Sequence, residues 1–397
     1  MTTAEHLAEL VVGPGGVNVQ RGQLVEISSD LGKEELTRAV ARAAYRRGAK
    51  FVEAIYWDPH VKRARLEHAE EDTLEFVPAW LGKRVLDLAT ERAASILLSG
   101  PTEPGLFDDL DPLRVALDRL PSLKEYLTVV NDRTINWAII PGPNERWAQL
   151  AHPDLSADEA LSQLWEDVAY ACRLDADDPG TAWQERLAAL GEIAAHLDER
   201  RFDALDFEGP GTELRVGLFP SSRWETAAVE TVDGVGHIVN LPSEEVFTAP
   251  DPARVHGVVR ATMPVEVGGV IVEGISVRFE DGHAVQIDAD RNADVLRRRA
   301  AKDEGASRLG EVALVDREGR VGQLGLVFFD TLLDENAASH VAMGNAYDRT
   351  VGDEDRPRAN QSEIHVDFMI GGDDVAVTGI TESGDRVPVL RDGRWQL

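Results

Sequence analysis

Residues 22–56 read GQLVEISSDLGKEELTRAVARAAYRRGAKFVEAIY, and this stretch decides the fold. Its two ends, 22–27 and 51–56, are short apolar runs of the kind that form β-strands. Between them, residues 33–47 carry apolar side chains at the spacing of one helical face. Gly48 follows at the position where helices commonly end in a left-handed residue. The stretch therefore predicts a strand–helix–strand unit, the building block of a parallel sheet.

Strand-like and helix-like runs continue to alternate through the first half of the chain. The runs are 74–81 and 85–92, which read as helical, 94–99, which reads as a buried strand, and the apolar runs 127–130 and 137–141. Residues 144–205 then read as helical, and Ser156 with Glu159 three positions later is typical of a helix start. This alternation predicts βαβ units and a mostly parallel sheet.

The character of the sequence changes after residue 206, where short β-rich runs are separated by Gly, Asp and Pro. Residues 280–283 read EDGH between two such runs and indicate a hairpin turn. A chain of 397 residues is long enough for two domains of ordinary size. We therefore predict an N-terminal α/β domain over residues 1–205, with a helical end, and a C-terminal α+β domain over residues 206–397.

The chain is strongly acidic, with a formal net charge of −30 at pH 7. Nucleic-acid binding needs a basic patch that displaces counterions, and the longest basic cluster, residues 297–302, reads as a solvated helix surface. We therefore exclude nucleic acid as a partner. The acidity fits a protein that stays soluble in a crowded cell, or one that favours cationic ligands such as divalent metals and N-terminal ammonium groups.

Cysteine content and hydropathy bear on the compartment. Cys172 is the single cysteine, so no intramolecular disulfide can form, which fits a reducing cytoplasm. Its place in a helical apolar pattern favours a buried small side chain over a reactive thiol. The N-terminus lacks the features of a signal peptide, and no run approaches the roughly 18 consecutive apolar residues that span a membrane. We expect a cytoplasmic protein.

Four short segments of the second half bring carboxylates and imidazoles together. They are residues 240–248 with Glu245, 309–313 with Glu311, 330–340 with Glu335 and His340 (followed by Tyr347), and 362–369 with His365 and Asp367. Three Glu, two His and one Asp are enough ligands for two divalent ions with one bridging carboxylate. The absence of thiolates favours Zn, Co, Mn or Mg in a catalytic site. Because all these residues follow residue 206, the α+β domain is predicted to be the catalytic, metal-binding domain.

His365 and Asp367 lie two positions apart in a strand-like run. Side chains at this spacing point to the same face of a strand. Two polar groups on an apolar strand are costly unless something satisfies them, and a metal ion would do so. The alternative is an aspartate that orients a structural histidine.

Glu335 and His340 are five positions apart, which does not match one face of a helix. We expect Glu335 at the entrance of a helix over residues 337–343, with His340 one turn in, Gly344 at its end and Tyr347 beyond it. A carboxylate at a helix start is also favoured by the helix dipole, so Glu335 could be a cap or a ligand.

Glu311 is expected to begin a strand after Gly310, and Glu245 follows a turn fixed by Pro242. An acid beside a turn is usually exposed, so each of the two, judged singly, reads as a surface residue more readily than as a ligand. The hypothesis of a metal site therefore depends on the whole set.

The same segments, in the same order, resemble the signature blocks of the thermophilic metallo-aminopeptidase family of the aminopeptidase T type. The most specific blocks are NLPSEEVFT at residues 240–248 and DTLLDEN at residues 330–336, and the resemblance extends over nearly the whole chain. Two features depart from the family pattern. Ser243 stands where Thr is more common, and the charged segment 348–363 is short, so we expect the lid near the site to differ.

The resemblance implies a two-metal exopeptidase that acts on peptide N-termini. By position in the motifs, the implied metal ligands are Glu245, Glu311, His340, His365 and Asp367. Glu335 would be a further ligand or an acid–base residue, and Tyr347 would stabilise the reacting carbonyl. We choose Glu311 as the bridging carboxylate. The family also implies a homodimer in which the N-terminal domain helps to close the site.

The sequence thus predicts a metal-dependent aminopeptidase of class EC 3.4.11, which hydrolyses the N-terminal residue from peptides with water activated by two metal ions. Two alternatives stay open at this point. One is a metal-dependent amidase or other hydrolase that acts on a non-peptide substrate. The other is a non-catalytic, acidic metal-binding protein whose site has lapsed, against which every polar position of the expected set is present.

Overall fold

The computed structural model describes residues 1–118, 120–121 and 123–397, and these residues form two compact units. Unit 1 consists of Met1–Leu187, Ala227–Ser243 and Phe328–Leu332, and unit 2 consists of Ala188–Thr226, Glu244–Val327 and Leu333–Leu397. Compactness does not show which stretch of chain folds alone. The division into domains 1–205 and 206–397 therefore stays a prediction.

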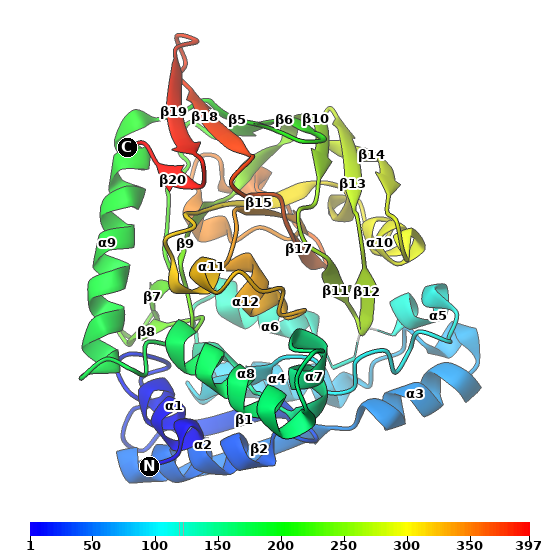
Figure 1. Cartoon of the computed structure of the whole chain (residues 1–397), viewed down its shortest axis with the longest axis vertical. Helices are drawn as coiled ribbons and strands as arrows, with labels where there is room; N and C mark the ends of the chain where they lie inside the picture. The colour runs from blue at the N-terminus through cyan, green and yellow to red at the C-terminus, as the bar shows by residue number, and fades with distance from the viewer. Residues whose placement is uncertain (119, 122) are drawn as a thin grey trace. The chain divides into compact units, whose positions relative to one another are not determined.

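Unit 1 is built on a four-stranded, wholly parallel sheet with the strand order β2-β1-β3-β4. Figure 1 labels β1 and β2 of this sheet. Its strands are β1 (Leu24–Asp30), β2 (Phe51–Trp57), β3 (Ala94–Ser99) and β4 (Asn136–Pro141). Helix α2 (Glu34–Arg47) connects β1 to β2 and packs on both strands. It ends at Gly48, whose φ of 102° is left-handed backbone that glycine adopts without a steric penalty. The predicted strand–helix–strand unit is confirmed.

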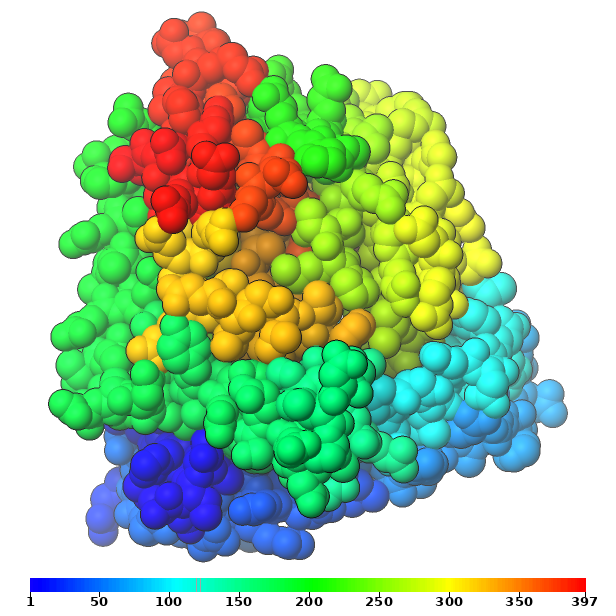
Figure 2. Space-filling model, in the orientation of Figure 1, coloured from blue at the N-terminus to red at the C-terminus, as the bar shows by residue number. Residues whose placement is uncertain are grey.

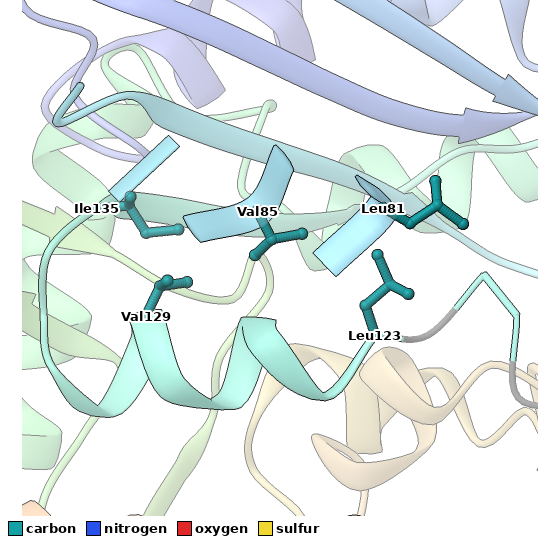
Figure 3. Close-up of a cluster of buried hydrophobic side chains, with 5 residues drawn as sticks. All are labelled: Leu81, Val85, Leu123, Val129 and Ile135. Carbon is teal, nitrogen blue, oxygen red and sulfur yellow. The ribbon is translucent and has the colours of Figure 1, made fainter. Parts of the chain in front are cut away.

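The other helices that precede β5 lie before, between and after the remaining strands of this sheet along the chain. They are α1 (Thr3–Val12), α3 (Pro59–His68), α4 (Ala79–Thr90), α5 (Pro112–Leu117), α6 (Lys124–Asn131), α7 (Glu145–Ala151), α8 (Ala157–Ala171) and α9 (Pro179–Arg200), with the 3-10 turn η1 (Glu71–Thr73). Helices α4 and α6 face each other, and Leu81 and Val85 of α4 meet Val129 of α6 in an apolar cluster (Figure 3). Leu123 and Ile135, which flank α6, complete this cluster. Burial of each of these aliphatic side chains contributes about 1.5–3 kcal/mol to the stability of the fold.

Two details of the first half differ from the sequence-based expectation. The helix predicted over residues 74–81 is wrong for most of its length, because α4 begins only at Ala79, after Pro78. A proline keeps the residue before it out of the helical region, so a helix cannot easily run through this point. The apolar run 127–130 lies in helix α6, whereas the run 137–141 lies in strand β4.

Other local predictions for the first half are confirmed. Ser156 precedes α8, and its backbone N–H donates to Glu159 Oε2 over 3.2 Å, as expected for a capping pair. The side chain of Cys172 is fully buried.

Among the described residues, no helix combines the length and the apolar character needed to cross a membrane.

Unit 2 contains an eight-stranded, wholly antiparallel sheet with the order β14-β13-β10-β6-β5-β18-β19-β20. Its strands are β5 (Ala204–Gly209), β6 (Thr212–Leu218), β10 (Pro250–Arg260), β13 (Ser276–Glu280), β14 (His283–Asp288), β18 (Ala376–Ile380), β19 (Arg386–Arg391) and β20 (Arg394–Trp395). The predicted hairpin at residues 280–283 joins β13 to β14, and Asp281 and Gly282 both have positive φ, as a two-residue hairpin loop requires. The exposed tip of the β18–β19 hairpin stands out from the surface (Figure 2).

A second antiparallel sheet of unit 2, with the order β17-β16-β15-β9, carries the residues of interest. Its strands are β9 (Glu245–Thr248), β15 (Leu309–Val315), β16 (His340–Gly344) and β17 (His365–Met369). The remaining elements are the pairs β7 (Ala228–Glu230) with β8 (Gly236–Ile238) and β11 (Val265–Val267) with β12 (Val270–Val272), the helices α10 (Ala293–Ala300), α11 (Arg320–Leu324) and α12 (Thr331–Glu335), and the 3-10 turns η2 (Gly305–Ser307), η3 (Asp348–Thr350) and η4 (Arg356–Arg358). The predicted fold class, a parallel α/β region followed by an antiparallel α+β region, is confirmed.

Candidate metal centre

One face of the sheet β17-β16-β15-β9 collects five of the predicted ligands. They are Glu245 on β9, Glu311 on β15, His340 on β16, and His365 and Asp367 on β17. The strand register brings them together, because Asp367 lies opposite Ala342 and Ala342 lies opposite Glu311. Residues that are directly opposite share a face, and the small side chain of Ala342 leaves room for the two carboxylates on either side of it.

His365 and Asp367 follow the alternation predicted from the sequence. Strand β17 begins at His365, and His365 Nε2 lies 3.3 Å from Asp367 Oδ1. Phe368, between Asp367 and Met369, is fully buried on the opposite face. The prediction that the two polar side chains lie on the same face is confirmed.

His340 lies on a strand, so the helix predicted over residues 337–343 is wrong. Strand β16 pairs with β15 on one side and with β17 on the other, which satisfies its backbone N–H and C=O groups without a helix. All residues of β16 are buried, so packing on both faces outweighs the helix propensity of the alanines. Gly344 ends this strand rather than a helix, and a Cβ there would lie 2.2 Å from the Ile364 carbonyl oxygen.

The carboxylates converge on the two imidazoles. His340 Nε2 lies 3.1 Å from Glu245 Oε2 and 3.6 Å from Glu311 Oε1. The other oxygen of the same carboxylate, Glu311 Oε2, lies 3.6 Å from His365 Nε2. Glu311 therefore stands between the two histidines and turns one oxygen toward each.

Glu245 and Glu311 are buried, each only 5% exposed, so the surface reading of these two residues is wrong. One oxygen of each, Glu245 Oε2 and Glu311 Oε2, accepts no hydrogen bond, although each approaches an imidazole nitrogen. A buried carboxylate oxygen without a hydrogen bond is costly. The sheet thus places at the centre of the cluster two carboxylate oxygens that face imidazole nitrogens without a hydrogen bond of good geometry.

Glu335 joins the cluster from outside the sheet. It is the last residue of the short helix α12, not the first of a helix, so stabilisation by the positive end of a helix dipole does not apply. Ligand atoms of Glu335, His340 and Asp367 lie within 4.8 Å of one another, as do those of Glu245, Glu311 and His340. Burial, together with the charges of Asp367 and Glu245, raises the pKa of Glu335 well above its usual value.

The negative charges of the cluster raise the pKa of both histidines, whereas burial lowers it. Burial opposes the imidazolium form, but Asp367 and Glu311 outweigh it and raise the pKa of His365 to about 10. Glu245 and Glu311 likewise raise the pKa of His340 well above its usual value, against the effect of burial. Without bound cations, the two imidazolium groups therefore offset part of the negative charge of the carboxylates.

Sequence reasoning missed the backbone groups that orient the histidines. His365 Nδ1 donates to the Asn345 carbonyl over 2.8 Å, which leaves Nε2 to face Glu311 and Asp367. His340 Nδ1 makes a longer contact, 3.3 Å, with the Ala338 carbonyl. Such contacts fix the tautomer and orientation of a ligating histidine. A carbonyl has no side-chain signature, so no sequence pattern could have identified these partners.

Tyr347 lies beside the cluster, at the start of η3 and beyond β16. Its ring centroid is 5.4 Å from that of His365. Burial and the neighbouring charges of Glu311 and Asp367 raise the pKa of its hydroxyl, so the phenol remains protonated and can donate a hydrogen bond.

The charged segment 348–363 is fastened to the rest of unit 2. Ser221 donates to Asp355 over 2.7 Å, Arg358 pairs with Asp251 over 2.6 Å, and the Asn360 side chain donates to the Gly344 carbonyl over 2.6 Å. The last contact links this segment directly to the end of β16. Whether it forms a different lid stays a prediction.

The chain matches the family described as thermophilic metalloprotease (M29) over residues 2–395. It is 43% identical to aminopeptidase T of Thermus thermophilus, with 98% of both chains covered, and 36% identical to aminopeptidase PepS of Streptococcus thermophilus, with 99% of this chain and 98% of the relative covered. The sequence-based resemblance is confirmed.

Solved structures agree with this relationship. Wild-type AmpT from Thermus thermophilus superposes with a TM-score of 0.88 at 42% identity, over 100% of this chain and 99% of that one. A dihydroxypyridine dioxygenase from Pseudomonas putida shares the fold alone, with a TM-score of 0.56 at 14% identity over 100% of this chain and 98% of that one. Sequence, structure and the order of the site residues lead to one conclusion: the chain belongs to the thermophilic metalloprotease (M29) family.

Proposed function

We propose that this protein is a metal-dependent aminopeptidase, which hydrolyses the first peptide bond of peptides with a free N-terminus at a centre of two divalent ions. The observation that carries the proposal is the meeting of buried carboxylates and imidazoles on one sheet face, with carboxylate oxygens that accept no hydrogen bond. The names of the full-length relatives, aminopeptidases T and PepS, support the same activity.

The donor set fits divalent cations. Oxygen and imidazole nitrogen atoms suit Zn, Co, Mn or Mg, and the cluster contains no thiolate. Glu245, His340, His365 and Asp367 would hold one ion or the other. Glu311 would bridge them, because its two oxygens face different histidines. Glu335 would be a further ligand or the acid–base residue.

Bound divalent ions would supply a water of lowered pKa and polarise the scissile carbonyl. The chain provides the proton transfers and the remaining charge stabilisation. Glu335 or a neighbouring acid would accept the proton of the attacking water and pass it to the leaving amine. The Tyr347 hydroxyl would donate a hydrogen bond to the oxyanion of the tetrahedral intermediate.

We also propose a homodimer, which the family resemblance implies. The acidic surface, with a net charge of −30, would keep such a protein in solution and attract peptide ammonium groups.

Removal of metal should abolish activity. Protein stripped with a chelator is expected not to cleave leucine p-nitroanilide, and Zn²⁺, Co²⁺ or Mn²⁺ should restore cleavage. If metal binds but no ion restores cleavage, an amidase or other hydrolase with a non-peptide substrate becomes the better reading. If the protein neither cleaves the substrate nor binds metal, the interpretation as a non-catalytic protein with a lapsed site gains support.

Metal uptake should release protons. The pKa of His365 is about 10 in the metal-free protein, so its imidazole carries a proton at pH 7 that an ion must displace. Apparent metal affinity should therefore fall as the pH is lowered from 10 toward 6. Calorimetric titration in buffers of different ionisation enthalpy would measure the protons released, and identical heats in all buffers would contradict the prediction.

Glu311→Gln should lose both metal and activity, because a neutral amide cannot bridge two cations. Metal content per chain by atomic emission is the measurement. Glu318→Gln, which alters an exposed carboxylate that pairs with Arg394, is the matched control and should keep both. Retention of two ions per chain by Glu311→Gln would count against the bridging role.

Tyr347→Phe should keep its metal and lose turnover. Loss of an oxyanion donor typically lowers kcat by about 10²–10³-fold. Steady-state kinetics with metal analysis would measure both quantities. Tyr45→Phe, which removes a surface hydroxyl that accepts from the Val52 N–H, serves as the control. Turnover like that of the wild type in Tyr347→Phe would remove Tyr347 from the mechanism.

A further inference from the structure

Arg349 holds an unusual place beside the metal cluster. Its guanidinium carbon lies 5.0 Å from the ring centroid of Tyr347 and 5.6 Å from that of Phe247. The two rings meet edge to face, with centroids 5.8 Å apart and an interplanar angle of 62°. The arginine therefore occupies the corner that the two rings form, and its side chain is only 12% exposed.

Glu225 holds the guanidinium in this corner. Arg349 Nε donates to Glu225 Oε2 over 2.6 Å, a short, charge-assisted bond. The backbone of Glu225 is itself fixed, because it exchanges two hydrogen bonds with Phe247 of β9, of 2.9 and 3.0 Å. Carboxylate, guanidinium and aromatic corner thus form one unit with the strand that also carries Glu245.

Tyr347 needs such support because its own backbone lies outside the sheet. The residue has φ −80° and ψ 91° at the start of a single 3-10 turn. Its ring contacts come from His365, Phe247 and Arg349. A displacement of about 1 Å of a catalytic donor is enough to lower a rate by roughly 10²-fold.

We propose that Arg349, held by Glu225, is a positioning residue that fixes the ring of Tyr347 for hydrogen-bond donation to the reacting carbonyl oxygen. The inference rests on the proposed role of Tyr347 and extends it to two residues outside the proposed ligand set. A planar guanidinium can stack on an aromatic face while it hydrogen-bonds a carboxylate in its own plane. Because Glu225 neutralises the charge, the pair adds no net charge to the site.

The test is a double-mutant cycle between Arg349→Met and Tyr347→Phe. Alone, Arg349→Met should lower kcat about tenfold, the scale of one cation–π contact, with KM and metal content unchanged. In the Tyr347→Phe background it should cause no further loss, because the hydroxyl it positions is gone. Additive losses in the cycle would overturn the inference.

Glu225→Gln provides a milder variant should Arg349→Met fail to fold. It weakens the bond to Arg349 without removing the guanidinium, and it should show the same dependence on Tyr347. The matched control is Arg173→Met, because Arg173 also lies over an aromatic ring, that of Trp183, at 5.0 Å, but belongs to unit 1 and not to the segment that carries Tyr347. It should lower the melting temperature and leave kcat unchanged.

A second readout does not need activity. The chain has five tyrosines, so ¹³C-tyrosine labelling gives few resonances, and the one absent from Tyr347→Phe belongs to Tyr347. In metal-free protein this resonance should be single in the wild type and broadened or split in Arg349→Met. An unchanged resonance would contradict the positioning role, even if the wild type proved inactive on peptides and the proposed function failed. An active wild type with Tyr347→Phe unimpaired would instead refute the inference together with the role of Tyr347.

Discussion

The burial of several carboxylates and imidazoles against one another is the constraint on which the rest of unit 2 depends. Glu245, Glu311 and His340 are removed from water on an otherwise apolar sheet. Such an arrangement is strongly unfavourable unless opposite charges lie within a few ångströms, so the strand register must hold to better than one residue. Small residues serve the same end, because a Cβ at Gly310 would lie 2.2 Å from the Gly344 carbonyl oxygen. Packing and chemistry therefore constrain the same backbone atoms.

The parts of the fold that local pattern determines could be predicted from the sequence. Residues 22–56 carry a strand period, a helix period and a terminating glycine in order, and each signal acts within a few residues. His365 and Asp367 belong to the same class, because a period of two places them on one face of a strand whatever the partner strand is. For Glu311 only the strand could be predicted, from the apolar run that follows it; the strand begins two residues earlier, at Leu309, and the burial of Glu311 was not expected.

What could not be predicted depends on pairing between distant segments. Residues 337–343 are compatible with a helix by composition, and only the presence of β15 and β17 on both sides makes residues 340–344 a strand. For the same reason the burial of Glu245 was not predictable, because it depends on Val315, its partner on β15. The family resemblance implied the proposed ligand set, whereas the two-sided position of Glu311 and the contacts of Arg349 required coordinates.

The proposed ligand set draws on every strand of the sheet β17-β16-β15-β9, and both edge strands begin with a member of it, Glu245 on β9 and His365 on β17. An edge strand pairs along its length on one side only, and local unfolding begins where such contacts are few. Ions held across all four strands would act as cross-links between segments far apart in the chain. Because such ions would bind the folded protein and not the unfolded chain, they would also stabilise the folded state. Metal occupancy of the site would then determine how strongly the sheet resists fraying.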